Sequence, residues 1–433
     1  MTDQNLDLDE QARQLYQGHM LAPMVRASTT PLRALALHYG AHAVYSEELV
    51  DRSITSTIRQ ENSTLGTIDY VKDPATIPKK TLKKLQKENR PSLLLRIDPK
   101  LEANKLVLQI GTGEPELALP AAKHVYQDVS SIDVNMGCPK KFSVSGGMGS
   151  ALLADKDRAS RIIKTLRAEI PRPVSCKIRL LKDTAATIDF MQAMIQAGAQ
   201  AIAVHARRVG DEATKPADWA TLQEVFELMK PKYPHIPFLV NGDFYDRQET
   251  KDLLDKTNAN GVLIGRPALY NTSIFRPLPQ EMDAKTKVVQ EYVQRAARYD
   301  IHHKNAKYVV CEMMSHRRTP SHRVPYLPQQ FPGGQNTAKT CNCHSMEAMC
   351  QLWNVSYSAS QYRSGTTIPG ASISSTSAGL SGDALMPGEH RYEDDYFLKH
   401  EKRHQSSLAQ ESSTTSSPDA KKARLEVAEE KKC

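Results

Sequence analysis

One cysteine stands where a thiol could take part in chemistry. Cys138 follows an apolar run at 131–137 (SIDVNMG) and directly precedes Pro139. The proline holds the cysteine in extended geometry and removes a backbone donor, so we expect the thiol at the rim of a sheet. An ordinary thiol has a pKa of about 8.5 and can donate a proton near neutrality, although it could equally serve as a nucleophile. Glycines at 146, 147 and 149 predict a mobile loop that closes over a substrate.

Other polar side chains end neighbouring apolar runs. Lys177 could stabilise negative charge, Gln109 offers a donor and an acceptor to a heterocycle, and His205 could meet a cofactor or a substrate. In VNGDF (240–244) and IGRPALYN (264–271), glycine and arginine predict a phosphate site. Such groups carry a desolvation cost unless a ligand meets them, which favours a binding site over a structural set. The complete set is Pro23, Met24, Gln109, Asn135, Cys138, Lys177, Arg179, His205, Asn241, Gly242, Gly265 and Arg266.

Eight short apolar runs, separated by amphipathic stretches, must position these residues. Most are nearly continuous in Val, Ile, Leu and Ala, as expected for parallel strands covered on both faces. We predict an α/β fold, a TIM (β/α)8 barrel with its site at the C-terminal strand ends, although periodicity alone leaves an open doubly wound sheet as an alternative. The expected strands are 19–25, 41–48, 104–111, 131–137, 173–180, 201–207, 236–243 and 261–266. The expected helices are 31–39, 115–126, 157–170, 185–197, 218–229 and 247–257.

Three further regions accompany the barrel, which we expect at 1–278. Residues 51–100 interrupt the alternation and predict a hairpin or extra strands over one barrel end. Apolar positions at three- and four-residue spacing predict a smaller helical domain at 279–355, with a Pro- and Gly-rich loop at 319–340. A segment rich in Ser, Thr, Gly and charge at 356–433 buries too little apolar surface to fold, so we expect a disordered tail.

Composition narrows the class of protein. Lys and Arg number 57 against 49 Asp and Glu, which suits a polyanionic partner without requiring one. No apolar run approaches the roughly 18 residues that span a bilayer, so we expect no membrane association. Seven scattered cysteines argue against a disulfide scaffold and favour a cytoplasmic protein, with KKAR (421–424) as a candidate nuclear address. The cluster Cys341, Cys343, His344 and Cys350 matches no common zinc spacing, so we expect no metal.

The ordered motifs resemble those of the tRNA-dihydrouridine synthases over about residues 19–315. The segments are LAPMV, LVLQIG, IDVNMGCPK, GGMGSALL, VSCKIRL, AVHAR, VNGDF and GVLIGRPAL. Within the family, VYSEEL, NMGCPK and NAKYVVCEMM are most similar to the eukaryotic tRNA-dihydrouridine(20) synthase type. The resemblance implies an FMN-bearing barrel and a helical tRNA-binding domain, and we expect a monomer. It also implies reduction of a D-loop uridine, at nucleotide 20, by NADPH or NADH.

The resemblance also implies residue roles. Cys138 is the catalytic acid that protonates C5, while hydride goes to C6 of an extruded uracil. The lysines of 79–87 and a basic helix face at 295–318 are candidate tRNA contacts. One departure is Ala206, where the family more often has glycine between the histidine and the arginine. Expected cofactor contacts are Pro23, Met24, Val25, Gln109, Lys177, His205, Asn241, Gly242, Asp243, Gly265 and Arg266; expected substrate contacts are Asn135, Lys140 and Arg179.

Two other functions stay open on the sequence. A flavin barrel that reduces free pyrimidines would share the cofactor residues but would not need the basic helical domain. A non-catalytic tRNA-binding protein would need neither Cys138 nor Lys177. If the protein forms dihydrouridine in tRNA but does not reduce free uracil, the first alternative is excluded. If the purified protein carries a flavin whose yellow colour NADPH bleaches, the simplest form of the second alternative is excluded.

Overall fold

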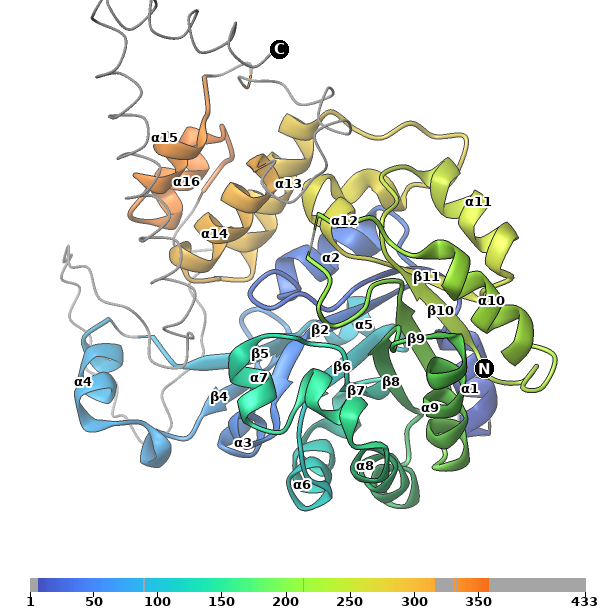
Figure 1. Ribbon diagram of the computed structural model, residues 1–433. Coiled ribbons are helices and arrows are strands. Elements are labelled where there is room, and N and C mark those ends of the chain that lie inside the picture. The colour runs from blue at the N-terminus through green and yellow to red at the C-terminus, as the bar shows by residue number, and fades with distance from the viewer. Residues whose placement is uncertain (1–6, 89, 213, 316–330, 332–333, 358–433) are drawn as a thin grey trace, which may run out of the picture. The chain divides into compact units, whose positions relative to one another are not determined.

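Eight parallel strands close into a barrel in a computed structural model that describes residues 7–88, 90–212, 214–315, 331 and 334–357 (Figure 1). Neighbouring strands follow the order β1-β11-β10-β9-β8-β7-β6-β2, and β1 pairs with both β11 and β2. This closure confirms the predicted barrel and excludes the open sheet. The strands are β1 (Gly18–Leu21), β2 (Ala43–Val50), β6 (Leu106–Gly111), β7 (Ser131–Asn135), β8 (Val174–Arg179), β9 (Ala201–His205), β10 (Phe238–Asn241) and β11 (Gly261–Ile264).

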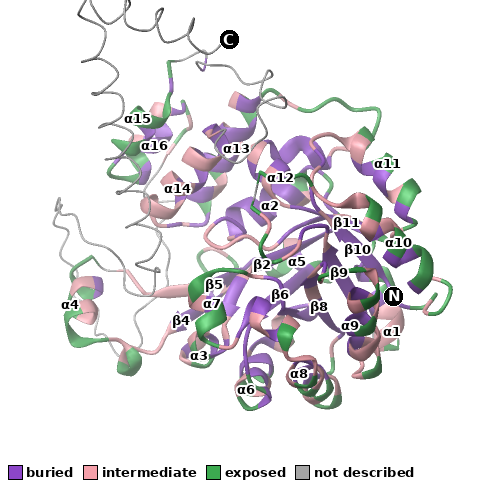
Figure 2. Ribbon diagram, in the orientation of Figure 1, coloured by how far each residue is buried: buried purple, intermediate pink, exposed green. Residues whose placement is uncertain are grey.

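Helices cover the outside of the barrel at the six predicted places, each within one residue of the expected bounds. Their starts are set locally: Asp183 and Asp246 accept hydrogen bonds from the backbone N–H three residues on, and Pro115 occupies a first-turn position that needs no donor. Figure 2 shows the strands buried and the exposed residues on the outer faces of these helices. They are α2 (Thr30–His38), α6 (Pro115–Val125), α8 (Lys156–Glu169), α9 (Thr184–Gln196), α10 (Trp219–Met229) and α11 (Arg247–Thr257).

The barrel interior divides into an apolar part and a polar column. Inward side chains such as Met20, Val107 and Leu263 form one buried cluster with Tyr16, which follows the N-terminal helix α1 (Leu8–Leu15). The Tyr16 hydroxyl hydrogen-bonds to the hydroxyls of Ser131 and Ser175, at 2.5 and 2.8 Å. A polar column on β7 and β8 therefore begins at the N-terminal end of the barrel and leads toward its opposite end.

The interruption after β2 is a three-stranded antiparallel sheet, which confirms the extra strands. Buried Arg96 binds Asp69 through two N–H···O contacts of 2.7 and 2.6 Å within it. The sheet packs on α2 through Thr30, which donates to the Arg96 carbonyl, and near the end of α6 through Arg59 and Asp128. Its predicted place over a barrel end is therefore wrong, since it fills the gap between two outer helices. Its strands are β3 (Thr57–Asn62), β4 (Thr67–Lys72) and β5 (Leu93–Ile97), with α3 (Asp51–Thr55), α4 (Lys79–Glu88) and α5 (Pro99–Glu102) nearby in sequence.

The described residues beyond the barrel form helices, as predicted for this region. Helix α13 packs on α2, and fully buried Trp353 meets Phe331 edge to face. One helix, α15, begins inside the expected loop at 319–340, because the Asn336 side chain accepts from the Lys339 backbone N–H at 2.8 Å. Of that loop, the structure describes residues 331 and 334–340. The rest of the loop and the tail from residue 358 lie outside the described residues. The helices are α13 (Lys285–Arg298), α14 (His303–Met314), α15 (Thr337–Cys341) and α16 (Met346–Leu352).

Within the described part of the chain, no helix has the length and apolar content needed to cross a bilayer. The same residues hold no group of three His, Cys, Asp or Glu side chains placed to share a metal ion. Cys341 of the cysteine cluster and Cys311, which precedes it by 30 residues, lie with their sulfurs 3.7 Å apart. The chain divides into two compact units, and α4 up to Lys84 belongs to the smaller one.

Candidate active site

Strand register brings the predicted polar residues together at the C-terminal end of the barrel. Asn135 is level with Lys177 across β7 and β8, and His205 is level with Asn241 across β9 and β10. Since side chains alternate along a strand, these residues share the inward face with the apolar layer beneath them. Gln109 and Asn135 are buried, whereas Lys177, His205 and Asn241 are partly exposed at the mouth.

The barrel mouth is rich in cations that surround a neutral histidine. Burial, reinforced by the charges of Lys177 and Arg179 and of two further arginines, lowers the pKa of His205 well below its usual range. Arg207 lies 3.3 Å from His205 Nε2, and because arginine only donates, Nε2 must accept and Nδ1 must carry the proton. Burial also lowers the pKa of Lys177 to about 8, so its ammonium stays mostly charged at neutral pH. The mouth therefore suits an electron-rich or anionic ligand.

A buried carboxyl group, missed in the sequence analysis, fixes the orientation of Gln109. Asp133 on β7 is 0% exposed and accepts from Gln109 Nε2 at 2.9 Å and from the Ser175 hydroxyl at 2.6 Å. Burial raises the pKa of Asp133 to about 6. Because the Gln109 amide nitrogen points to Asp133, the amide carbonyl is the group turned away from it. The only sequence signal was an acidic residue inside the apolar run at 131–137.

The loop that carries Cys138 is held by hydrogen bonds on both sides. Asn135 Oδ1 accepts from the backbone N–H groups of Gly137 and Cys138, at 2.9 and 3.1 Å. Arg179 Nε donates to the Gly137 carbonyl at 2.7 Å, and the Ser150 backbone N–H donates to the Cys138 carbonyl at 2.9 Å. Asn135 and Arg179, expected at the substrate, thus also shape the loop that presents the thiol.

Burial raises the pKa of the partly exposed Cys138 thiol to about 11, and the charge of Glu48 adds to this effect. The thiol is therefore protonated at neutral pH, which favours a proton donor over a nucleophile. Gly149, in the loop predicted to be mobile, has φ +58 and packs closely on this cysteine. A Cβ at Gly149 would lie 2.7 Å from the Cys138 carbonyl oxygen, so the glycine permits a backbone contact that supports the thiol.

The loops after β10 and β11 are tied to each other. Asn241 Nδ2 donates to the Leu263 carbonyl at 2.8 Å, which fixes the ends of the two strands. Asp243 accepts from Arg266 at 2.8 Å and from fully buried Arg207 at 2.5 Å. The carboxylate of Asp243, a residue expected among the cofactor contacts, accepts from both arginines and so holds Arg266 in place.

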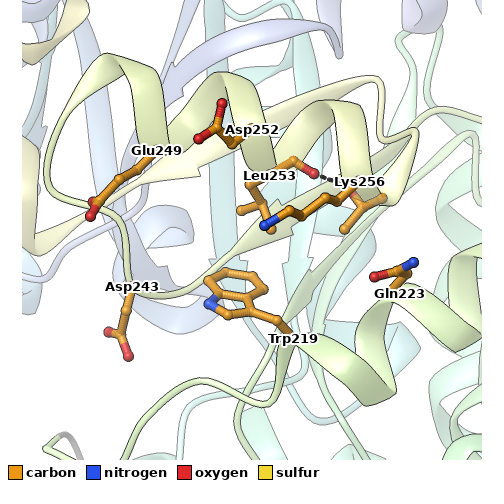
Figure 3. A pocket seen from close by; sticks show the side chains of 8 residues that line it. Trp219, Gln223, Asp243, Glu249, Asp252, Leu253 and Lys256 are labelled. Atoms are coloured by element: carbon orange, nitrogen blue, oxygen red, sulfur yellow. Dashed lines mark hydrogen bonds between the residues drawn. The ribbon is translucent and has the colours of Figure 1, made fainter.

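Gly242 lies against the aromatic ring of Trp219, which lines a separate pocket. A Cβ at Gly242 would lie 2.3 Å from a ring carbon of Trp219. Figure 3 shows this indole between the loop of Asp243 and helix α11, in a pocket of about 240 Å³. The pocket lies outside the barrel, and its three carboxylates against one lysine do not suit a phosphate. Its lining residues are Trp219, Gln223, Asp243, Glu249, Asp252, Leu253, Lys256 and Thr257.

The remaining predicted residues lie around the same mouth. Pro23, Met24 and Val25 are partly buried in the loop after β1, and Met24 Sδ lies 3.9 Å from the Cβ position of Gly265. Lys140 is exposed beyond Cys138, near enough for its charge to affect a carboxyl group in the mouth.

The fold and these motifs agree with comparisons to known proteins. Residues 20–341 match the family described as Dihydrouridine synthase (Dus), so the chain belongs to this family. A tRNA-dihydrouridine(20) synthase [NAD(P)+] of Schizosaccharomyces pombe is 38% identical over 304 residues, covering 68% of this chain and 59% of that one. The protein of the same description from Saccharomyces cerevisiae is 36% identical over 313 residues, covering 69% of this chain and 78% of its own. A tRNA-dihydrouridine(16/17) synthase [NAD(P)(+)] of S. pombe is 31% identical over 261 residues, or 60% and 57% of the two chains.

Proposed function

We propose that this chain is an FMN-dependent tRNA-dihydrouridine synthase that reduces the C5–C6 double bond of a D-loop uridine, at nucleotide 20, with NADPH or NADH. The observation that carries the proposal is a protonated thiol, Cys138, on the rim of a cation-lined barrel mouth. Family membership and the names of the two yeast tRNA-dihydrouridine(20) synthases support the substrate and the reductant.

The residues at the mouth fit a flavin nucleotide. The Lys177 ammonium forms no hydrogen bond or ion pair with any described residue, although burial lowers its pKa, and a charge in such a place needs a partner. Arg266, Gly242 and Gly265 would hold the phosphate, and the oriented amide of Gln109 would meet the polar edge of the ring. The bound flavin would supply the hydride for C6.

The chain itself would supply the proton and the geometry. Cys138 would hold a proton at Sγ and release it to C5 of an extruded uracil, while Asn135 and Arg179 fix the loop that presents the thiol. Neutral His205, with its proton on Nδ1, would donate one hydrogen bond toward the ligand without adding charge. The cations of the mouth that do not contact the flavin would attract the phosphates of the RNA backbone.

The basic groups of α13 and α14 would contact the tRNA backbone, and the lysines of α4 are a separate set of candidate contacts. Arg298 on α13 is exposed, and Lys304 and Lys307 on α14 are partly exposed. On α4, Lys79, Lys80, Lys83 and Lys87 are exposed. The part of the expected basic face at 316–318 lies outside the described residues.

Replacement of the thiol tests the proposal directly. Cys138→Ala should keep its flavin and the rate of flavin reduction by NADPH, but lose roughly 10²–10⁴-fold in dihydrouridine formation, the usual effect of removing a general acid. Cys341→Ala, at an exposed thiol, is the matched control. Undiminished turnover of the Cys138 variant would refute the acid assignment. Purified protein without any flavin, or reduction of free uracil as readily as tRNA, would refute the proposed function.

A further inference from the structure

Glu48 is a buried carboxyl group in the barrel mouth that the expected ligand contacts leave unexplained. It lies near the end of β2, is 9% exposed, and interacts with the side chains of Cys138 and Asn135. Its Oε1 is buried without a hydrogen-bond partner, and no ion pair joins Glu48 to any described residue. A buried charge of this kind is costly and does not stabilise the fold by itself, so a structural role explains it poorly.

The surrounding backbone makes room for this carboxyl group. The pairing of β2 with β6 shifts register between Tyr45 and Glu48, as at a β-bulge. Opposite, Gly111 on β6 has no side chain, and a Cβ there would lie 2.7 Å from Glu48 Oε1. Both features make room for the Glu48 carboxyl group, because a side chain at position 111 would displace it. The interaction of Glu48 with the Cys138 side chain then brings the carboxyl group beside the thiol.

The charges around Cys138 show what the carboxyl group does. Lys140 from the loop after β7, and Lys177 and Arg179 from β8, all act on Cys138 or Glu48. Cations beside a cysteine favour the thiolate, which cannot donate a proton. Glu48 is the acidic group that acts directly on this thiol, and its charge raises the pKa of Cys138. Burial raises the pKa of Glu48 itself to about 7, so the carboxylate is present from neutral pH upward, where ionisation of the thiol would begin.

We propose that Glu48 is a positioning residue that keeps the Cys138 thiol in its proton-donating state and opposes its conversion to a nucleophilic thiolate. The inference rests on the proposed function, in which Cys138 is the proton donor. Without Glu48, the cations that attract an anionic cofactor to the mouth would also stabilise the Cys138 thiolate, and the thiol would lose the proton that it has to donate. The Glu48 charge opposes this effect at the thiol alone and leaves the charges of the cations that face the ligand unchanged.

Alkylation of Cys138 by iodoacetamide tests the proposal without any substrate. The rate follows the thiolate fraction, and mass spectrometry of the peptide that contains Cys138 separates it from the other thiols. Glu48→Gln should move the midpoint of the rate–pH curve to lower pH by about one unit, since a like charge within contact distance shifts a titration by this order. Glu48→Asp, which keeps the charge one methylene farther away, should give an intermediate midpoint.

Glu47→Gln is the matched control, because it makes the same chemical change one residue earlier. The Glu47 carboxylate accepts from the Arg26 backbone N–H at 2.8 Å, an interaction that a glutamine carbonyl can preserve. Its midpoint should equal that of the wild type, and Glu48→Gln should also move the alkaline limb of tRNA reduction to lower pH. Equal midpoints in both Glu48 variants and the wild type would overturn the inference. Wild-type protein inactive on tRNA would instead refute the proposed function, whatever the alkylation result.

Discussion

Replacement of Asp133 by asparagine should change how the stability of the barrel depends on pH. Burial raises the pKa of this fully buried carboxyl from 3.8 to about 6, so folding favours its protonated form. The stability that this group contributes is complete below the unfolded pKa and is lost as pH rises through the folded pKa. A tenfold change in proton affinity is about 1.4 kcal/mol, so the folded state loses about 2 kcal/mol between pH 4 and pH 7 through this residue alone.

Asp133→Asn removes the titration while it keeps the shape of the side chain. The asparagine carbonyl can still accept one strong hydrogen bond, but Gln109 and Ser175 now compete for it, which costs about 1–3 kcal/mol at every pH. The variant should therefore be less stable than the wild type at pH 4, and the deficit should shrink by about 2 kcal/mol by pH 7. The change of this stability difference with pH measures the ionisation of Asp133, whereas its constant part measures the lost hydrogen bond.

Urea unfolding at several pH values between 4 and 7 measures this difference, provided that the transitions are reversible. Asp255→Asn is the matched control, because Asp255 is exposed and forms only a surface pair with Lys251. Its difference from the wild type should stay nearly constant over the same range. A constant difference for the Asp133 variant too would show that the buried carboxyl does not titrate as argued, and would refute the electrostatic reasoning for the mouth.

Two further substitutions test the extra sheet and the loop after β10. Arg96→Met removes the cation that pairs with the buried Asp69 carboxylate and should cost about 3–5 kcal/mol in denaturant unfolding. Lys123→Met at an exposed ion pair should cost less than about 1 kcal/mol, and similar losses for both would contradict the argument. Gly242→Ala drives a methyl group into the adjacent indole and should weaken flavin binding roughly tenfold, since overpacking costs about 1–3 kcal/mol. Gly210→Ala, with open space at its Cβ, should bind flavin as the wild type does, and equal flavin content in both variants would contradict the close fit at Gly242.

The barrel was predictable because its signals are local. Parallel strands buried on both faces leave near-continuous apolar runs, and capping aspartates and first-turn prolines mark where the helices begin. The strand-end residues were also predictable, since the fold places the ends of all eight strands at one rim. Lys177 and His205 could therefore be assigned to one site before their register was known.

Residues whose role depends on register or on distant neighbours could not be found in this way. Asp133 appears as one acidic residue inside an apolar run, and Glu48 follows a second glutamate at the end of another run. Only the pairing with β6 shows what faces them. The sheet after β2 was misplaced for the same reason, because its position follows from Arg96 and its contacts with α2 rather than from its own pattern. Short α15 depends on the single cap at Asn336.

The three carboxyl groups of the mouth share one physical logic. Each lies against a different group: Asp243 against Arg266, Asp133 beneath Gln109, and Glu48 beside Cys138. Spread over the rim, they would cancel the positive charge that draws an anionic ligand. Held in separate hydrogen-bonded or buried places, each instead sets the orientation or the protonation of one neighbour, because interactions at contact distance in a poorly solvated site outweigh those across the mouth. Loss of any one carboxylate should therefore disturb a different property of the site, namely arginine placement, amide orientation or thiol acidity, rather than ligand attraction as a whole.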